Sequence, residues 1–257
     1  MRNQETTKHD YGHALLIAGA YGRTGCAILA AKAALRSGCG LVSVHLPGRC
    51  VDPMQAAFPE AMVSIDPSPT LFSTLPTHLE YYTAIAAGPG LGTDEATQHA
   101  MHTLLENRPS QMPLILDADA LNILSLHKDW LPLASGAIIT PHAREYQRLF
   151  ADADPITMAS VHNLIIVKKA HHTHIYAPDG RVYENLTGNA GMATAGCGDV
   201  LTGILLGIIS QGNRDLFNST CLGVRIHGEI GDKCIEKQSE SSLIASDMVE
   251  ELKNISI

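Results

Sequence analysis

The hydrophobic residues of the chain fall into short runs that are separated by polar and glycine-containing segments. Such runs lie at 14–18, 41–46, 84–87, 113–116, 137–139 and 164–167. A short continuous apolar run is typical of a strand that is buried on both faces, as in a parallel sheet. The pattern therefore predicts a set of buried parallel strands.

Longer segments between these runs have helical character. Residues 26–37 are rich in alanine and leucine and stop before Gly38, and Thr93 is a candidate N-cap for a helix that reaches about Glu106. The apolar stretch 200–209 predicts a buried helix, and a last helix is predicted near 246–252. Residues 173–177 and 181–184 flank Pro178-Asp179-Gly180 and predict a β-hairpin.

Strands that alternate with helices predict an α/β fold, a three-layer α/β/α arrangement around a central, mostly parallel sheet. Polar or glycine residues follow the predicted strands, at Gly19, Gly88, Asp117, Thr140 and Lys168. Ligands of open α/β sheets bind outside the carboxyl ends of the strands. We therefore expect the functional site at this edge.

Composition narrows the class of function. The 257 residues are 45% hydrophobic and carry a net charge of −8, with a pI of about 5.9. An acidic chain of this kind is a poor non-specific binder of nucleic acid or of anionic membranes, so neither partner is expected. No apolar run approaches the roughly 18–20 residues of a membrane span. The six cysteines form no C-x-x-C pair, and we expect reduced thiols in a cytoplasmic protein.

The segment 188–199 carries the strongest chemical signal. It is rich in glycine and small residues and ends at Asp199, directly before the predicted buried helix. Backbone N–H groups of such a segment can converge on one point, and the helix adds its positive N-terminal end, which together make an anion hole. A carboxylate in the first helical turn can accept a proton from a hydroxyl that attacks a phosphoryl group. Asp199 is therefore the candidate catalytic base, although a glycine loop with an acidic N-cap is common.

Two further groups follow predicted strands. Residues 169–173 could lie along the phosphates of a nucleotide, while Lys168 and Lys169 alone would fit an exposed strand end. The histidines at 171, 172 and 174 suggest a metal, but no cysteine or carboxylate lies nearby in the sequence, so zinc is disfavoured.

In the segment 140–145, His142 faces the same edge as Asp199, and Glu145 could hold Mg²⁺ through water or simply decorate the first turn of a helix. Asp117 and Asp119 could orient cations, and for Asp119 helix capping is an equal alternative.

Two glycine loops, 19–25 and 88–92, would let a ligand approach the backbone closely. Neither has the G-x-G-x-x-G spacing of dinucleotide-binding proteins, and no acidic residue ends the strand at 41–46. A Rossmann dehydrogenase is therefore disfavoured.

These motifs, taken in order, resemble one family. They are Leu15–Gly19, Ala87–Gly92, Leu116–Asn122, Thr140–His142 with Glu145, and Gly188–Gly203. Together they resemble the ADP/ATP-dependent NAD(P)H-hydrate dehydratases of the ribokinase-like superfamily, from about Gly12 to Leu252. The resemblance implies a single ribokinase-like domain over 12–257, preceded by a tail or junction over 1–11.

The resemblance also implies residue roles. Asp199 is the catalytic residue, and Gly196, Cys197 and Gly198 form the anion hole. The nucleotide-binding positions are Lys169, Ala170, His171, His172, Thr173 and Gly198. The substrate-binding positions are Cys26, Ala27, Gly90, Gly92, His142 and Asp199.

The implied reaction is repair of hydrated NADH or NADPH. The hydrate hydroxyl is phosphorylated by ADP or ATP with Mg²⁺, ADP being the expected donor, and phosphate then leaves to restore the ring. Alternatives are a small-molecule kinase of the same superfamily, acting on a thiazole, a pyrimidine or a sugar alcohol, and a nucleotide-binding regulator without activity. Ala170, Ala195 and Cys197 depart from the family pattern, and the two alanines narrow the backbone conformations allowed there.

Two expectations concern the periphery. Only about a dozen residues separate Phe150 from Leu164, where the family has a full helix, so this edge is expected to be reduced. The predicted helix 26–37 is apolar nearly all round, which requires either another covering layer or a subunit contact. With the tendency of the family toward homotetramers, a homo-oligomer is predicted, with a tetramer favoured.

Overall fold

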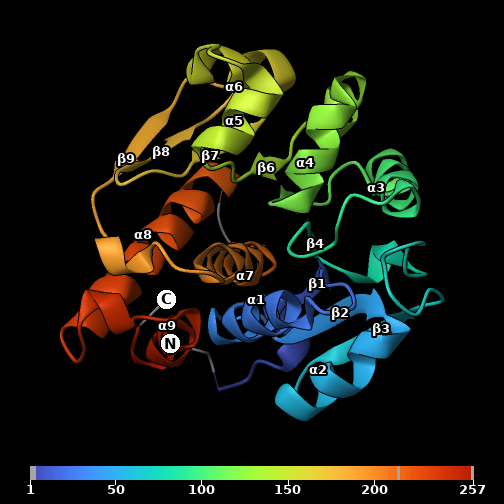
Figure 1. Ribbon diagram of the computed structural model, residues 1–257, viewed down its shortest axis with the longest axis horizontal. Helices are drawn as coiled ribbons and strands as arrows, with labels where there is room; N and C mark the ends of the chain where they lie inside the picture. Colours follow the sequence, from blue (N-terminus) through green and yellow to red (C-terminus); the bar gives the residue numbers. More distant parts are fainter. Residues whose placement is uncertain (1–3, 213–214, 256–257) are drawn as a thin grey trace.

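The structure is a computed structural model that describes residues 4–212 and 215–255, and a single sheet runs through it (Figure 1). In the described residues this sheet has nine strands in the order β3-β2-β1-β4-β5-β6-β7-β8-β9. The strands are β1 (His13–Ile17), β2 (Leu41–Pro47), β3 (Met62–Asp66), β4 (Ala84–Ala87), β5 (Leu114–Leu116), β6 (Ile138–Ile139), β7 (Ile165–Lys168), β8 (Thr173–Tyr176) and β9 (Val182–Asn185). Strands β1 to β7 pair in parallel, and β8 and β9 add an antiparallel hairpin at one edge.

Helices cover both faces of the sheet. One face carries α1 (Thr24–Arg36), α2 (Val51–Ala57), α7 (Cys197–Ile209) and α8 (Leu216–Ile235), with α9 (Ala245–Glu251) packed outside them. The other face carries α3 (Glu95–Asn107), α4 (Asp119–Leu126), α5 (Ala143–Phe150) and α6 (Pro155–His162). The predicted three-layer α/β/α fold with a mostly parallel sheet is thus confirmed.

Strand β1 shows why the apolar runs are continuous. Ala14 and Leu16 belong to the core on the α1 and α7 side, and Leu15 and Ile17 belong to the core on the α3 and α4 side. All four are fully buried. Because successive side chains of a strand point to opposite faces, a strand covered on both sides needs apolar residues at every position.

Helices α1 and α7 approach each other closely through two glycines of α7. A Cβ atom added to Gly203 would lie 2.1 Å from the carbonyl oxygen of Ala30, and one added to Gly207 would lie 2.2 Å from that of Ala34. Helix α1 also packs against α9. Its apolar surface is thus covered within the chain, and it gives no argument for a subunit contact.

The structure corrects several local predictions. Helix α3 begins at Glu95 with Asp94 as its N-cap, not Thr93, because the chain turns helical only after Asp94. At the edge that was expected to be reduced, between Phe150 and Leu164, the chain still forms helix α6, which is eight residues long. Strand β3 and helix α2 were not predicted at all.

The predicted tail is also partly ordered. From Lys8 to Tyr11 the chain forms a 3-10 helix, and the carbonyl oxygen of Tyr11 accepts a hydrogen bond from Gly40 just before β2. Residues 1–3 of that tail lie outside the described residues.

Candidate active site at the carboxyl edge of the sheet

The candidate site lies where the strand order changes direction, between β1 and β4. The loops that follow these two strands meet there, and the N–H of Gly19 donates a hydrogen bond to the carbonyl oxygen of Pro89 at 2.8 Å. In open α/β sheets this switch point is the crevice where ligands bind. The predicted ligand-binding edge and the two glycine loops thus come together.

Helix α7 begins at this edge with the glycine-rich segment. Gly196 is its N-cap with φ of +91°, a left-handed conformation that favours glycine. A side chain at Gly196 would also meet Leu29 and Ala245. Cys197 and Gly198 follow as the first helical residues, so the predicted anion hole coincides with a helix N-terminus, where N–H groups remain available.

Asp199 lies in the first turn of α7, as predicted, and its carboxylate accepts a hydrogen bond from the thiol of Cys26. Burial raises the pKa of Asp199 to about 6, and the negative charge of Asp117 adds to the shift. The thiol of Cys26 and the charge of Lys169 act in the opposite direction. A carboxyl group with this pKa is mostly ionised at pH 7 and still basic enough to take a proton.

A buried ion pair lies beneath the start of α7. Lys169 Nζ is 2.8 Å from Asp117 Oδ1, and Thr202 donates to Asp117 Oδ2 at 2.8 Å. Burial would raise the pKa of Asp117, but the charge of Lys169 and these hydrogen bonds hold it below its usual range. Burial would lower the pKa of Lys169, but the charges of Asp117 and Glu145 raise it above its usual value. The pair is therefore charged, and it places a cation close to Gly198.

The side chain of Asp119 does not cap its own helix but contacts the glycine loop 88–92. Its Oδ2 accepts a hydrogen bond from the N–H of Gly92 at 2.8 Å, and its Oδ1 accepts from the side chain of Asn122. Ala118, between the two aspartates, has φ of +48° and ψ of −115°, a strained conformation for a residue with a side chain. This strained residue directs Asp117 and Asp119 to different partners.

A cavity of about 700 Å³ opens beside the anion hole. Its lining includes Lys169, Ala170, His171, Thr173 and Gly198, all predicted nucleotide-binding positions. His172 does not belong to this lining: its Nδ1 lies 3.3 Å from Glu184 of β9.

The opposite wall of this cavity was not predicted from the sequence. It comes from α8 and includes Val224, His227 and Gly228. His227 donates through Nε2 to the carbonyl oxygen of Cys197 at 2.9 Å, and burial lowers its pKa to about 4. Its ring is therefore neutral. A histidine in the middle of a long helix carries no sequence signal for this position.

His142 is the N-cap of α5 and lines the same cavity. Its Nδ1 accepts hydrogen bonds from the backbone N–H groups of Arg144 and Glu145, so the neutral ring carries its proton on Nε2. This Nε2 lies 3.5 Å from Glu145 Oε1, so its proton faces the carboxylate of that residue. The Oε2 of Glu145 accepts from the N–H of His142 at 2.8 Å, which completes a capping box.

Cys26 and Ala27 differ in their access to a ligand. Ala27 is fully buried in the core, and Cys26 is partly exposed and faces Asp199. A Cβ atom added to Gly90 would lie 3.0 Å from the Cys26 sulfur, so this glycine lets the two loops close around one point. The structure thus favours Cys26 over Ala27 as a contact.

The departures from the family pattern cause no backbone strain. Among the non-glycine residues of 4–212 and 215–255, positive φ angles occur at His78, Ala118, Ala151 and Asn163. Ala170 and Ala195 are not among them, so neither position has the positive φ that would require glycine.

His174 of β8 and His172, just before this strand, both lie near a carboxylate. Glu184 Oε1 lies 3.3 Å from His172 Nδ1 and 3.6 Å from His174 Nε2, because β9 pairs with β8. The sequence placed no acid nearby, and only strand pairing brings one. Within the described residues, no group of three or more histidine, cysteine or acidic side chains is arranged to hold a metal ion.

Comparison with known proteins identifies the family of this chain. The fold defines an α/β protein of the ribokinase-like class. A ribokinase-like superfamily protein of Enterococcus faecalis superposes on this chain with a TM-score of 0.85 at 28% sequence identity. The superposition covers 99% of this chain and 89% of that one. The sequence profile of the NAD(P)H-hydrate dehydratase family matches residues 14–254. The chain therefore belongs to the NAD(P)H-hydrate dehydratase family, and the predicted family is confirmed.

Individual relatives support the same assignment. The ADP-dependent (S)-NAD(P)H-hydrate dehydratase of Neisseria meningitidis is 34% identical over 90% of this chain and 80% of its own length. The ADP/ATP-dependent NAD(P)H-hydrate dehydratase of Bacillus subtilis, co-crystallised with ATP and Mg²⁺, superposes with a TM-score of 0.82 at 28% identity, over 99% of this chain and 92% of that one.

The chain spans about half the length of the bifunctional NAD(P)H-hydrate repair enzymes that it matches. That of Moorella thermoacetica is 34% identical over 93% of this chain and 48% of its own length. In the part of the chain that the structure describes, no helix is both long and apolar enough to cross a membrane.

Proposed function

We propose that this chain removes water from hydrated NADH or NADPH by phosphorylating the hydrate hydroxyl, with ADP as the preferred donor. The observation that carries the proposal is Asp199: a carboxylate with a pKa of about 6, at a helix N-terminus, between Cys26 and the lysine of a buried ion pair. A base, an anion hole and a nearby cation are the parts that phosphoryl transfer to a hydroxyl requires.

The chemistry has two stages. The hydrate oxygen forms a bond to the terminal phosphorus of the nucleotide as the bond to its bridging oxygen breaks, and Asp199 takes the hydroxyl proton. Phosphate then leaves the ring carbon, and an adjacent carbon loses a proton to restore the double bond. The products are NAD(P)H, phosphate and the shortened nucleotide. The first stage is useful because phosphate is a far better leaving group than hydroxide.

The cavity of about 700 Å³ is the proposed nucleotide site. Its volume falls within the range of ligand pockets, roughly 300–1,000 Å³. Ala170, His171 and Thr173 would follow the phosphates, with Lys169 near the transferred group, while His172 would support the loop from outside. The neutral ring of His227 and the side chain of Val224 would offer an apolar wall to a base.

Mg²⁺ fits the donor set of this site as a nucleotide-bound ion. Mg²⁺ keeps most of its water and needs only one or two carboxylates besides the phosphates. Glu145 keeps its Oε1 free of backbone hydrogen bonds and lies close enough to Lys169 to raise its pKa. When bound, the ion would neutralise charge on the phosphates, with Glu145 holding it through water.

The decisive experiment incubates the chain with hydrated NADH, Mg²⁺ and either ADP or ATP, and follows the return of the reduced-nicotinamide absorbance. Recovery that requires a nucleotide and releases phosphate supports the proposal. Faster recovery with ATP than with ADP would overturn the donor preference alone. Failure with both, together with phosphorylation of a thiazole or sugar alcohol, would favour the kinase alternative.

A homo-oligomer, with a tetramer favoured, is proposed on the family resemblance alone, because α1 is covered within the chain. Light scattering at micromolar concentration tests it, and a monomeric mass would contradict it. The proposed cytoplasmic location is supported by the cysteines, all free thiols.

A further inference from the structure

Two arginines and a tyrosine lie at the carboxyl ends of β1 and β2, outside the machinery described so far. Arg23 and Tyr21 belong to the loop after β1, and Arg49 follows β2. Arg49 and Tyr21 are exposed, and Arg23 keeps 48% of its side chain exposed. The chain as a whole carries a net charge of −8, so the exposed cations at the ligand-binding edge differ from its overall acidic character.

Arg23 is fixed beside the predicted substrate loop. Its Nη1 lies 3.6 Å from Asp119 Oδ2, the oxygen that also accepts the N–H of Gly92. Its Nη2 lies 2.7 Å from the point that a Cβ atom on Gly92 would occupy. Because a guanidinium has five N–H donors and this one makes a single long ion pair among the described residues, donors remain for a ligand.

Arg49 and Tyr21 form a second contact on the same side. The guanidinium of Arg49 lies 5.3 Å from the centre of the Tyr21 ring, a cation–π arrangement. Tyr21 is 61% exposed, so one face of a flat, amphipathic ring is available for stacking. An aromatic ring backed by an arginine is a common platform for a nucleobase.

The loop after β3 holds both contacts in place. The carbonyl oxygen of Thr70 accepts a hydrogen bond from the N–H of Tyr21 at 2.9 Å, and that of Pro69 accepts from the N–H of Arg49 at 3.0 Å. The loop makes both contacts through its backbone carbonyl groups. It positions the backbone of the other two loops.

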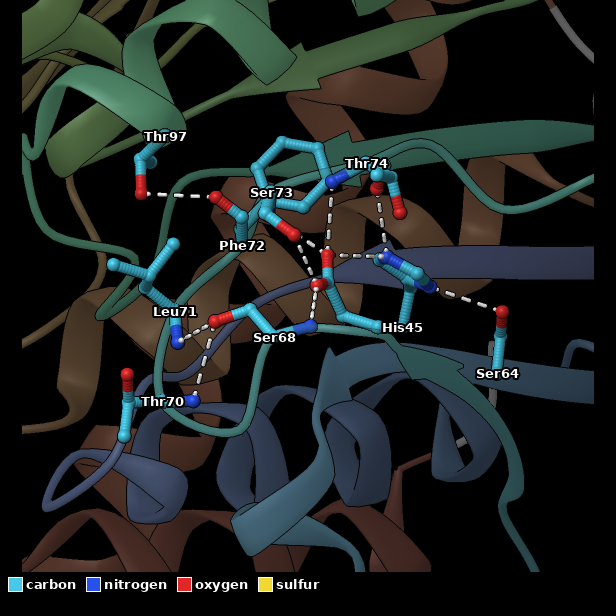
Figure 2. Close-up of polar contacts among 10 residues, drawn as sticks. His45, Ser64, Ser68, Thr70, Leu71, Phe72, Ser73, Thr74 and Thr97 are labelled. Atoms are coloured by element: carbon cyan, nitrogen blue, oxygen red, sulfur yellow. Dashed lines mark hydrogen bonds and ion pairs between the residues drawn. The ribbon is translucent and has the colours of Figure 1, made fainter.

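This loop is itself fixed by a buried carboxylate, as Figure 2 shows. Asp66 accepts hydrogen bonds from the N–H groups of Ser68, Ser73 and Thr74 and from the Ser73 hydroxyl. His45 Nε2 lies 2.9 Å from the carbonyl oxygen of Thr74 and 3.3 Å from Asp66. A loop held by this many buried hydrogen bonds is rigid before any ligand arrives, which lowers the entropy lost on binding.

We propose that Arg23, Tyr21 and Arg49 form a subsite for the part of the dinucleotide that does not react: Arg23 binds its diphosphate, and the Tyr21–Arg49 pair stacks its second base. The proposal rests on the proposed function. The lining of the cavity beside Lys169 includes no residue of the loop after β1, whereas Arg23 is the N-cap of α1, three residues before Cys26, the neighbour of Asp199. A substrate whose hydroxyl reaches Asp199 therefore extends toward β1 and β2. Arginine is suited to a diphosphate because its planar fork matches two oxygens.

The test compares Arg23→Ala with Arg36→Ala, a control on the same helix whose exposed arginine pairs with Glu250 at its far end. Arg23→Ala should raise the KM for hydrated NADH about 10- to 100-fold and leave the KM for ADP and the melting temperature unchanged. Arg23→Lys should give a smaller rise, because the charge stays and the fork is lost. Arg36→Ala should change none of these values.

Direct binding of NADPH, which keeps the diphosphate and second base, separates this proposal from the proposed function. Arg23→Ala and Tyr21→Ala should each weaken NADPH binding by titration calorimetry, whether or not the hydrate is turned over. Normal NADPH binding by Arg23→Ala, no NADPH binding by the wild-type chain, or a rise confined to the KM for ADP would each overturn the subsite. Arg23-dependent NADPH binding without turnover would refute only the proposed function.

Discussion

Asp66 is buried and Asp199 is half-buried, and both lie at the carboxyl edge of the same sheet, but their surroundings differ in hydrogen-bond donors. Asp66 is surrounded by donors from its own loop, which overcome the effect of burial and hold its pKa below its usual value. Asp199 has the thiol of Cys26 and two neighbouring aspartates, and burial raises its pKa to about 6. The same side chain thus builds a scaffold in one region and stays chemically available in the other.

The difference lies in how completely each charge is compensated. A carboxylate that accepts several hydrogen bonds is stable as an anion and gives up proton affinity. A buried carboxylate with few donors keeps that affinity, at a cost to the stability of the folded chain. Replacing each aspartate by asparagine should therefore have opposite effects on folding.

The largest effect is expected for Asp199→Asn. The amide keeps the size of the side chain but cannot take the hydroxyl proton, so the turnover rate should fall by about 10²–10⁴. The variant should also melt at a higher temperature at pH 7, since removing a buried charge whose pKa is raised from 3.8 to about 6 relieves up to about 3 kcal/mol. Steady-state assays and thermal unfolding measure the two quantities.

The matched control for this change is Asp52→Asn, an exposed acid in the first turn of α2. It should alter neither rate nor melting temperature. Turnover by Asp199→Asn at the wild-type rate would remove this residue from the mechanism.

The second prediction is that Asp66→Asn destabilises the chain. An amide group offers one acceptor oxygen, and its NH₂ group would face the N–H donors of Ser73 and Thr74. Leaving such buried donors unpaired should cost about 2–4 kcal/mol of the free energy of unfolding. Urea unfolding at pH 7 measures it, and stability equal to the wild type would show that the loop is held by other contacts.

The third prediction separates the two aspartates by pH. Turnover should fall about tenfold per pH unit below about 6, as Asp199 takes up a proton before the reaction. The fold should survive this range, because protonation of Asp199 adds stability as the pH falls through 6 and offsets the stability lost at His227, whose buried ring has a pKa of about 4 and resists the protonation that an unfolded imidazole undergoes near 6.5. The stabilisation from Asp66 is lost only below its usual pKa of 3.8. Activity and circular dichroism measured from pH 8 to pH 4 test this, and loss of both together would contradict it.

Much of the fold could be predicted from the sequence because the central strands are buried on both faces. Leu15 and Ile85 lie in continuous apolar runs for this reason, and the helix α7 was equally clear. Strand β3 was missed because it forms the edge of the sheet, and Ser64 and Asp66 interrupt its apolar residues. The sequence of β3 alone does not specify which residues of β2 it pairs with.

The site could be predicted only in part. Asp199 is recognisable because the glycine-rich segment that precedes it in the sequence also forms the helix N-terminus at which it lies. The contact with Cys26 depends on how α1 packs against α7, and Glu184 meets His174 only through a hairpin. The donors of Asp66 are mostly backbone N–H groups, which every residue other than proline carries, so no side-chain pattern marks them in advance.

The glycines that let α1 and α7 touch have a consequence for how the enzyme tolerates mutation. Both helices present their N-terminal turns to the reaction, one with Cys26 and the other with Asp199, and Gly203 and Gly207 set the distance between their axes. A methyl group at either glycine would push the helices apart along their whole length. Gly203 and Gly207, one to two helical turns from Asp199, thus help to set the distance between the Cys26 thiol and the Asp199 carboxylate. A mutation at either glycine contacts no ligand but can still lower the rate of the reaction.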